Sequence, residues 1–260
     1  MRVNAFLCAG HSKWAKIARS KGATDAARSV VYSRHVAIIG AAVRSGGADP
    51  SLNIRLADAL VKARAADVPK QLLERALAAK STTEAAEEIS YEGIGPAATA
   101  VIVDALTDNR KRTAASVRAA FSKFGGEMQQ SGAVRHLFET RGTLLVHFKE
   151  EDQDKLLDAA VAAGALDVEW DQDDTSGVDD VVKDPAGGVI ARVICEAGVL
   201  QSVRQRMQAA GWPAISADVE RVPLSFVEIT GDEAIEDFAA FLARLDENPD
   251  VVKVWHNAAP

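Results

Sequence analysis

Four cations near the amino-terminal end of this chain have the residue types and spacing to bind a polyanion. Lys13, Lys16, Arg19 and Lys21 fall within nine residues, and Trp14 stands among them. No Asp or Glu occurs from residue 1 to residue 24, whereas a solvated protein surface normally mixes both signs of charge. Cations at helical spacing can follow a phosphate backbone, so the cluster predicts contact with nucleic acid.

Two interpretations stay open for the side chains in this cluster. Trp14 can stack on a base, although a lone tryptophan more often anchors the core of a helical bundle. The cations can bind phosphate or form an ordinary solvated surface, and the missing acids favour phosphate. Arg28 and Arg34 extend the predicted nucleic-acid-binding surface along the next helix.

A second group of cations, Arg110, Lys111 and Arg112, follows a predicted strand. Asn109 or Thr113 is expected to cap the helix that comes next, which would leave the three cations in an exposed loop between strand and helix. Positive charge is unfavourable at the amino-terminal end of a helix, because the helix dipole is positive there. A negative group should therefore compensate these cations, and a phosphate and Asp108 are both open as candidates.

Residue patterns typical of enzymes are missing from the sequence. The five histidines show no metal-binding spacing, and no Gly-x-Ser-x-Gly, Walker A or dinucleotide-binding motif occurs. Cys8 and Cys195 lie far apart, and Cys195 falls on a predicted buried strand, which favours free structural thiols. The acidic run over 171–184 lacks the ordered spacing of a calcium loop. We therefore expect no catalytic residue, no metal and no cofactor.

Charge is divided unevenly along the 260 residues. Residues 1–80 hold 14 Lys and Arg against 5 Asp and Glu, whereas residues 81–260 hold 16 against 32. A basic part with a net charge of +9 thus precedes an acidic part with a net charge of −16. Such a basic part suits a polyanionic partner. The apolar runs are shorter than the ~20 residues of a membrane helix, so we expect no membrane partner.

The first part of the chain is predicted to be helical. Helix formers and apolar residues at helical spacing predict two helices between residues 12 and 43. A third helix is expected from Leu52, and Val68-Pro69 opens a fourth. These elements form a bundle that we predict to be a basic helical domain over 1–88.

Strands and helices alternate in the rest of the chain, which predicts an α+β fold. A strand over 100–106 and a helix over 113–124 begin a middle domain. A β-α-β-β-α-β order follows, which predicts an acidic ferredoxin-like α+β domain over 143–221.

The carboxyl-terminal stretch is expected to return to the middle domain. A strand over 225–230, a helix over 233–247 and a strand over 251–255 can complete the sheet that begins at residue 100. The middle α+β domain is therefore predicted to be discontinuous, over 89–142 and 222–260.

Several short motifs give the chain a family resemblance that composition cannot supply. They are Gly10-His-Ser-Lys-Trp-Ala, Lys21-Gly-Ala, Tyr91-Glu-Gly-Ile-Gly-Pro96, Ala105-Leu-Thr-Asp-Asn-Arg110, Arg112-Thr-Ala-Ala115 and Phe121-Ser-Lys-Phe-Gly-Gly126. Through these motifs most of residues 9–148 resembles the YebC/PmpR family. Residues 149–257 resemble it mainly in the order of their elements.

The resemblance implies a fold and a class of function. It implies three domains, one helical and two α+β, without a known catalytic centre or cofactor. Bacterial members of the family are described as DNA-binding regulators and as ribosome-associated factors that ease the synthesis of proline-rich stretches. A mitochondrial member is a translational activator of cytochrome c oxidase.

The chain also departs from the family pattern at two places. Family members are typically richer in Lys and Arg at four positions where this chain has Ala18, Ser20, Ser29 and Val30. Its binding to phosphate is therefore expected to be weaker. Ala97 and Ala98 replace the glycines that usually follow Pro96, which is expected to stiffen that loop.

From these observations we expect a non-enzymatic translation factor. Its expected partners are ribosomal RNA or a ribosomal subunit, ribosomal proteins and mRNA, with a role in ribosome assembly or in the relief of stalled synthesis. The alternative is a DNA-binding transcriptional regulator, although no helix-turn-helix recognition pattern is visible in the sequence. Residues 1–8 resemble the stub of an organellar presequence, which favours the mitochondrion, with the cytoplasm as the alternative.

Overall fold

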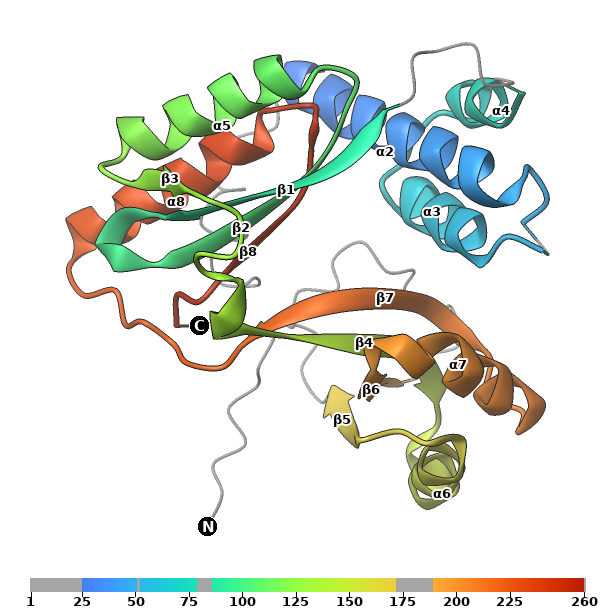
Figure 1. Cartoon of the computed structure of the whole chain (residues 1–260). Coiled ribbons are helices and arrows are strands. Elements are labelled where there is room, and N and C mark those ends of the chain that lie inside the picture. Colours follow the sequence, from blue (N-terminus) through green and yellow to red (C-terminus); the bar gives the residue numbers. More distant parts are fainter. Residues whose placement is uncertain (1–24, 51, 79–85, 172–188, 260) are drawn as a thin grey trace. The chain divides into compact units, whose positions relative to one another are not determined.

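A computed structural model of the chain describes residues 25–50, 52–78, 86–171 and 189–259. By their contacts, the residues divide into two compact units. Unit 1 comprises the described residues up to 138 and from 223 onward, and unit 2 comprises the described residues between 139 and 222. Figure 1 labels the helices and strands of both units.

Three helices form the first described part of unit 1. They are α2 (Asp25–Gly46), α3 (Ile54–Ala65) and α4 (Lys70–Ala78). Helix α2 packs against both α3 and α4, and the buried side chains between the helices form one apolar core that includes Ile39, Leu56 and Leu73. The predicted third and fourth helices are confirmed, because apolar residues recur at helical spacing on their inner faces.

Asn53 fixes the connection between α2 and α3. Its side-chain oxygen accepts a hydrogen bond from Leu56 N, which caps α3, and its amide donates to the carbonyls of Ala42 and Gly47. The side chain is buried, so these hydrogen bonds satisfy its polar atoms without water. The side chain of Asn53 therefore links the end of α2 to the start of α3.

The second part of unit 1 is a four-stranded antiparallel sheet in the order β3-β1-β2-β8. Its strands are β1 (Glu87–Ile94), β2 (Ala100–Thr107), β3 (Glu127–Gln129) and β8 (Val251–His256). Strand β8 comes from the carboxyl-terminal end of the chain and pairs with β2. The predicted return of this segment to the sheet of the middle domain is thereby confirmed.

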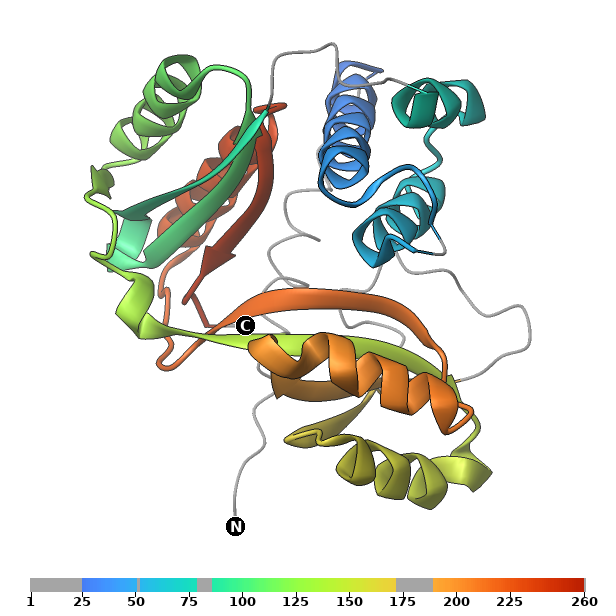
Figure 2. The same ribbon diagram turned by 45° about the vertical axis from the view of Figure 1, so that its right-hand side comes forward.

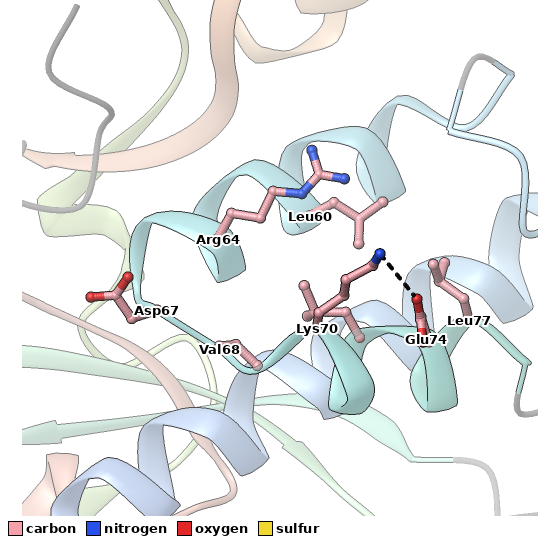
Figure 3. A pocket seen from close by; sticks show the side chains of 8 residues that line it. Leu60, Arg64, Asp67, Val68, Lys70, Glu74 and Leu77 are labelled. Carbon is pink, nitrogen blue, oxygen red and sulfur yellow. Dashed lines mark ion pairs between the residues drawn. The ribbon is translucent and has the colours of Figure 1, made fainter. Parts of the chain in front are cut away.

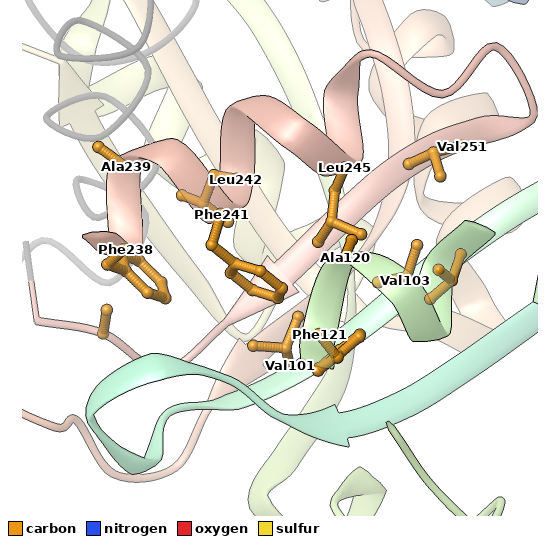
Figure 4. Close-up of a cluster of buried hydrophobic side chains, with 12 residues drawn as sticks. Val101, Val103, Ala120, Phe121, Phe238, Ala239, Phe241, Leu242, Leu245 and Val251 are labelled. Carbon is orange, nitrogen blue, oxygen red and sulfur yellow. The ribbon is translucent and has the colours of Figure 1, made fainter. Parts of the chain in front are cut away.

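Helices α5 (Arg110–Lys123) and α8 (Asp232–Asp246) pack against each other and against this sheet (Figure 1). Alternate residues of β2, such as Val101 and Val103, point toward these helices. Phe121 of α5 and Phe241 of α8 meet edge to face, with ring centroids 5.0 Å apart, and Figure 4 shows both rings in the core of this layer.

The Tyr91-Glu-Gly-Ile-Gly-Pro96 motif has a structural explanation, because its glycines lie where a side chain would not fit. A Cβ at Gly93 would stand 2.6 Å from the Phe121 ring, and one at Gly95 would stand 2.9 Å from Thr99. The sequence analysis missed strand β1, in which most of this motif lies, because two glycines and a proline in six residues suggested a loop.

Glu92 of the same motif fixes the segment that follows β3. Its buried carboxylate accepts hydrogen bonds from the backbone N–H groups of Gly132, Val134 and Arg135, at 2.8, 3.0 and 3.0 Å. Burial alone would raise the pKa of Glu92, but the three backbone donors and the charge of Arg135 lower it below its ordinary value. Glu92 is therefore ionised in the folded protein at neutral pH.

Unit 2 has the β-α-β-β-α-β order that the sequence predicts. Its elements are β4 (Phe138–Phe148), α6 (Gln153–Ala163), β5 (Asp167–Asp171), β6 (Val189–Glu196), α7 (Leu200–Ala209) and β7 (Ala214–Pro223). The strands form a sheet in the order β5-β6-β4-β7, which is the ferredoxin-like arrangement. Figure 2 shows α6 and α7 beside this sheet.

One face of the second sheet supplies the core of unit 2. Leu144 and Val146 of β4 and Val193 and Cys195 of β6 pack with the inner faces of α6 and α7. Cys195 is a free cysteine with no exposed surface, and burial raises the pKa of its thiol. A buried protonated thiol is unreactive, in agreement with the expected structural role.

The predicted fold class is confirmed, because a helical part precedes an α+β part with two sheets. The predicted strand over 225–230 is wrong, since Val227 makes only an isolated bridge with Ala258. The boundaries of the three expected domains stay a prediction. Among the described residues, no helix combines the length and the apolar character that crossing a membrane requires.

Candidate nucleic-acid interface

The second predicted cluster of cations lies at the start of α5. Asn109 is the N-cap residue, and its side chain accepts a hydrogen bond from Arg112 N at 3.1 Å. The three cations Arg110, Lys111 and Arg112 therefore form the first turn of the helix, and the predicted exposed loop over these residues is wrong. Thr113 does not cap the helix because its hydroxyl is buried and donates to Asp250.

Arg112 is neutralised within the protein. Its Nη2 donates to both carboxylate oxygens of Asp250, at 3.0 and 2.9 Å, and to Asp108 at 2.8 Å. The hydrogen bond and charge of Asp250, joined by those of Asp108, raise the pKa of the guanidinium. Asp108, one of the two expected compensating groups, is thus present, and Asp250 was not foreseen because it lies 138 residues along the chain.

Arg110 has a weaker partner than Arg112. Its Nη1 lies 3.5 Å from a carboxylate oxygen of Glu87 on β1, and both side chains are exposed. Tyr91 donates a hydrogen bond from its hydroxyl to the backbone carbonyl of Arg110, at 3.4 Å. An exposed ion pair contributes little free energy, so a phosphate can displace Glu87 from Arg110 at small cost.

The remaining cations of α5 have no acidic partner within the described part of the chain. Lys111 and Arg118 are exposed and lie two helical turns apart, so they point in the same direction. Ala115, Ala119 and Ser122 lie on the same side of the helix. We call these five residues the basic α5 face. Its small side chains allow a polyanion to approach the helix closely.

Helix α5 carries only positive charges, whereas the neighbouring α8 begins with negative charges. No acidic residue occurs between Asn109 and Gly126, whereas the neighbouring α8 exposes Asp232, Glu233 and Glu236. The acidic first turn of α8 interacts favourably with its own helix dipole, and it repels phosphate. A polyanion is therefore directed along α5 and away from α8.

The other predicted binding residues are distributed between described and undescribed segments. Lys13, Trp14, Lys16, Arg19 and Lys21 lie outside the described residues. Arg28 is exposed on α2. Arg34 is mostly buried, and its Nη2 donates to the carbonyls of Asp246 and Asn248 at the end of α8. Arg34 therefore caps α8, and this contact limits its availability to a phosphate.

Comparison with protein families identifies the chain. Residues 12–83 match the model of the TACO1/YebC protein N-terminal domain, and residues 86–258 match that of the TACO1/YebC second and third domain. The chain belongs to the TACO1/YebC family. The resemblance found in the sequence motifs is thereby confirmed.

Relatives of this TACO1/YebC chain are similar over almost their whole length. A probable transcriptional regulatory protein of Treponema pallidum is 37% identical over 96% of both chains, and one of Halorhodospira halophila is 40% identical over the same shares. The crystal structure of a conserved hypothetical protein from Aquifex aeolicus has a TM-score of 0.69 and 32% identity, and it covers 90% of this chain and 91% of its own. These relatives are bacterial proteins.

These TACO1/YebC relatives are named as probable transcriptional regulatory proteins. Within the residues that the structure describes, no group of three His, Cys, Asp or Glu side chains is placed to hold a metal ion.

Two features of the candidate site of this TACO1/YebC chain were not predicted from its sequence. Arg118 was not singled out, although its spacing of seven residues from Lys111 and the lack of acids around it were visible in the sequence. The pairing of Arg112 with Asp250 could not be found in this way, since it depends on β8 lying beside β2.

Proposed function

We propose that this TACO1/YebC chain is a non-enzymatic regulator of transcription that binds DNA. The observation that carries the proposal is the basic α5 face, on which Lys111 and Arg118 are exposed without an acidic partner among the described residues. The names of the bacterial relatives support the same function. Contacts between cations and phosphates would position the protein on the duplex, and no covalent step would be needed.

Salt dependence of binding tests the proposal. Each phosphate contact releases counterions, so the Lys111→Ala, Arg118→Ala double variant should bind duplex DNA more weakly. The slope of log affinity against log salt should also fall by about two units. The matched control is the Lys155→Ala, Arg244→Ala double variant, which loses the same charge from exposed cations of α6 and α8. Equal slopes for both double variants would contradict the proposal.

A translation factor that binds ribosomal RNA is the second candidate. The family resemblance supports it, because the motifs resemble a family with ribosome-associated members. Phosphate contacts do not distinguish DNA from RNA, so the basic α5 face would serve either polymer. Competition between duplex DNA and ribosomal RNA for the chain, together with sedimentation in lysate gradients at low and high salt, separates the two candidates.

We propose the cytoplasm as the location, because the named relatives are bacterial. The mitochondrial expectation rests on residues 1–8, which lie outside the described residues, and no comparison supports it. Microscopy of the full-length chain fused to a fluorescent protein at its carboxyl-terminal end, in the source cells, tests this location.

A further inference from the structure

Helices α3 and α4 are joined as in a helix-turn-helix. The turn between them comprises the four residues Ala66 to Pro69, which is the length found in such motifs. Asp67 adopts the left-handed conformation with φ of 55°, and Val68 N donates to Ala63 O at 3.0 Å. This hydrogen bond runs back across the end of α3 and fixes the direction in which the chain leaves the helix.

The turn is part of the core, so the orientation of α4 is fixed by packing. Val68 is buried together with Ala63 and Leu60 of α3 and with Leu73 and Ala76 of α4. Helix α2 packs against both helices. In DNA-binding proteins of this type, a third helix supports the pair in the same way, and the second helix of the pair enters the major groove.

The outward side of α4 carries polar side chains that can recognise base edges. Gln71, Glu74 and Arg75 are exposed, whereas Leu73 and Ala76 face the core. Glutamine pairs with adenine, arginine with guanine, and glutamate accepts a hydrogen bond from cytosine. Gln71 and Arg75 are one helical turn apart, so both side chains reach the same side.

Charges near the turn suit the DNA backbone. Residues 54–78 contain five cations and three acids. A hollow of about 420 Å³ lies between α3 and α4, and its charged lining residues are Arg64, Asp67, Lys70 and Glu74 (Figure 3). Lys70 forms an ion pair with Glu74 at 3.7 Å, so Arg64 is the cation of the hollow that can contact a phosphate. Arg64 lies in the last turn of α3, the helix that crosses the backbone in such complexes.

We infer that α3 and α4 form a DNA-reading helix-turn-helix in which Gln71 and Arg75 contact bases in the major groove of duplex DNA. This inference rests on the proposed DNA-binding function and adds sequence specificity to it. The basic α5 face supplies affinity for any duplex, and α4 selects among sequences.

A selection experiment tests the inference with the full chain and a pool of DNA duplexes that carry a randomised 20-base-pair core. The wild-type chain should enrich a common sequence. The Gln71→Ala, Arg75→Ala double variant should lose at least about tenfold of the preference for that sequence over the unselected pool, while its affinity for the unselected pool changes much less. The matched control is Gln205→Ala, Arg206→Ala on α7, which should keep the preference.

The outcomes distinguish this inference from the proposed function. If the wild-type chain binds the pool but enriches no sequence, or if the α4 variant keeps the full preference, the inference is overturned and the proposed DNA binding stands. If the wild-type chain does not bind duplex DNA at low salt, the proposed function fails and the inference fails with it. Retained helical circular dichroism in the α4 variant shows that any loss is not due to unfolding.

Discussion

At the scale of single residues, buried polar groups and strained backbone positions decide local stability. Glu92 is a carboxylate without exposed side-chain surface, and its compensation comes mainly from backbone N–H groups. Ala97 and Ala98 adopt the left-handed conformation with φ of 53° and 58°. Both features lie in or directly after the Tyr91 to Pro96 motif. Hydrogen bonds to Glu92 therefore stabilise this short stretch, whereas the left-handed backbone of Ala97 and Ala98 destabilises it.

Replacement of Glu92 by Gln should lower the free energy of unfolding at pH 7 by about 1–3 kcal/mol, because three backbone donors lose a charged acceptor. The folded-state pKa is lowered, so the stabilisation is present above the ordinary Glu pKa of about 4.3 and is lost as the pH falls through the folded-state value. Urea unfolding between pH 3 and 7 measures this, with the exposed Glu127→Gln as the control. A variant as stable as the wild type at pH 7 would contradict the role of Glu92.

Replacement of Ala97 or Ala98 by Gly should stabilise the protein. The left-handed conformation costs an L-residue about 1–2 kcal/mol. Glycine avoids this cost, but it also makes the unfolded chain more flexible, which cancels about 0.4–1 kcal/mol of the gain. The free energy of unfolding of each variant, measured by thermal denaturation, should therefore rise by up to about 1 kcal/mol. Ala115→Gly on α5 is the control and should lose about 1 kcal/mol, because glycine is unfavourable inside a helix.

At the scale of elements, capping determines how α5 presents its charges. Because Asn109 caps the helix, Arg112 is turned toward Asp250 and Lys111 toward solvent. A helix that began later, at Thr113, would have left all three cations in a loop. The element boundary therefore separates a cation with a structural contact from a cation that is available to a ligand.

The Asn109→Ala variant should lose about 1 kcal/mol of stability, since the N–H of Arg112 loses its side-chain acceptor. The Asn109→Asp variant should keep it, because aspartate is an equally good cap and its charge is favourable at this end of the helix. Chemical denaturation of both variants measures the difference. An Asn109→Ala variant as stable as the wild type would show that the cap contributes nothing, and equal losses in both variants would show that the loss does not come from the capping hydrogen bond.

The sequence predicted elements best where apolar spacing and cap residues agree. The element order of unit 2 was predicted in this way, and its first helix, α6, ends where its inward-facing apolar residues end, at Gly164, which adopts the left-handed conformation. Strand β1 was missed because Gly93 within it and Gly95 directly after it resemble loop residues, although both are needed for close packing. The turn of the helix-turn-helix was hidden because Asp67 stands where glycine is usual.

The site could be predicted less fully than the fold. The cations of the first turn of α5 were found from sequence because they are adjacent. Arg34 was predicted as a nucleic-acid contact, yet it reaches the end of α8, more than 200 residues away. Contacts of this length depend on tertiary structure, and periodicity within one segment carries no information about them.

At the scale of the whole molecule, the two units should respond to pH in opposite directions through one carboxylate in each, the buried Glu92 and the partly buried Glu169. Burial raises the pKa of Glu169 in unit 2, and the charge of Arg192, 3.7 Å away, opposes this. A raised folded-state pKa contributes stability that is present below the ordinary Glu value and is lost as the pH rises through the folded-state value. For Glu92 in unit 1 the sign is reversed.

Hydrogen exchange measured by mass spectrometry tests this difference unit by unit, after correction for the intrinsic pH dependence of exchange. We expect Glu92→Gln to increase exchange in unit 1 at pH 7 and to have less effect near pH 4. We expect Glu169→Gln to leave unit 2 as protected as the wild type at pH 7, or more protected. Increased exchange of unit 2 in the Glu169→Gln variant would contradict the assigned sign.

The burial of Cys195 gives unit 2 its own chemical reporter. In a Cys8→Ser background this thiol is the single cysteine of the chain, and it has no exposed surface in the folded state. A disulfide reagent such as dithionitrobenzoate can modify it only when the core of unit 2 opens. The labelling rate therefore measures the opening of unit 2 in the native chain. A change in this rate when DNA binds to unit 1 would show that the two units are energetically coupled.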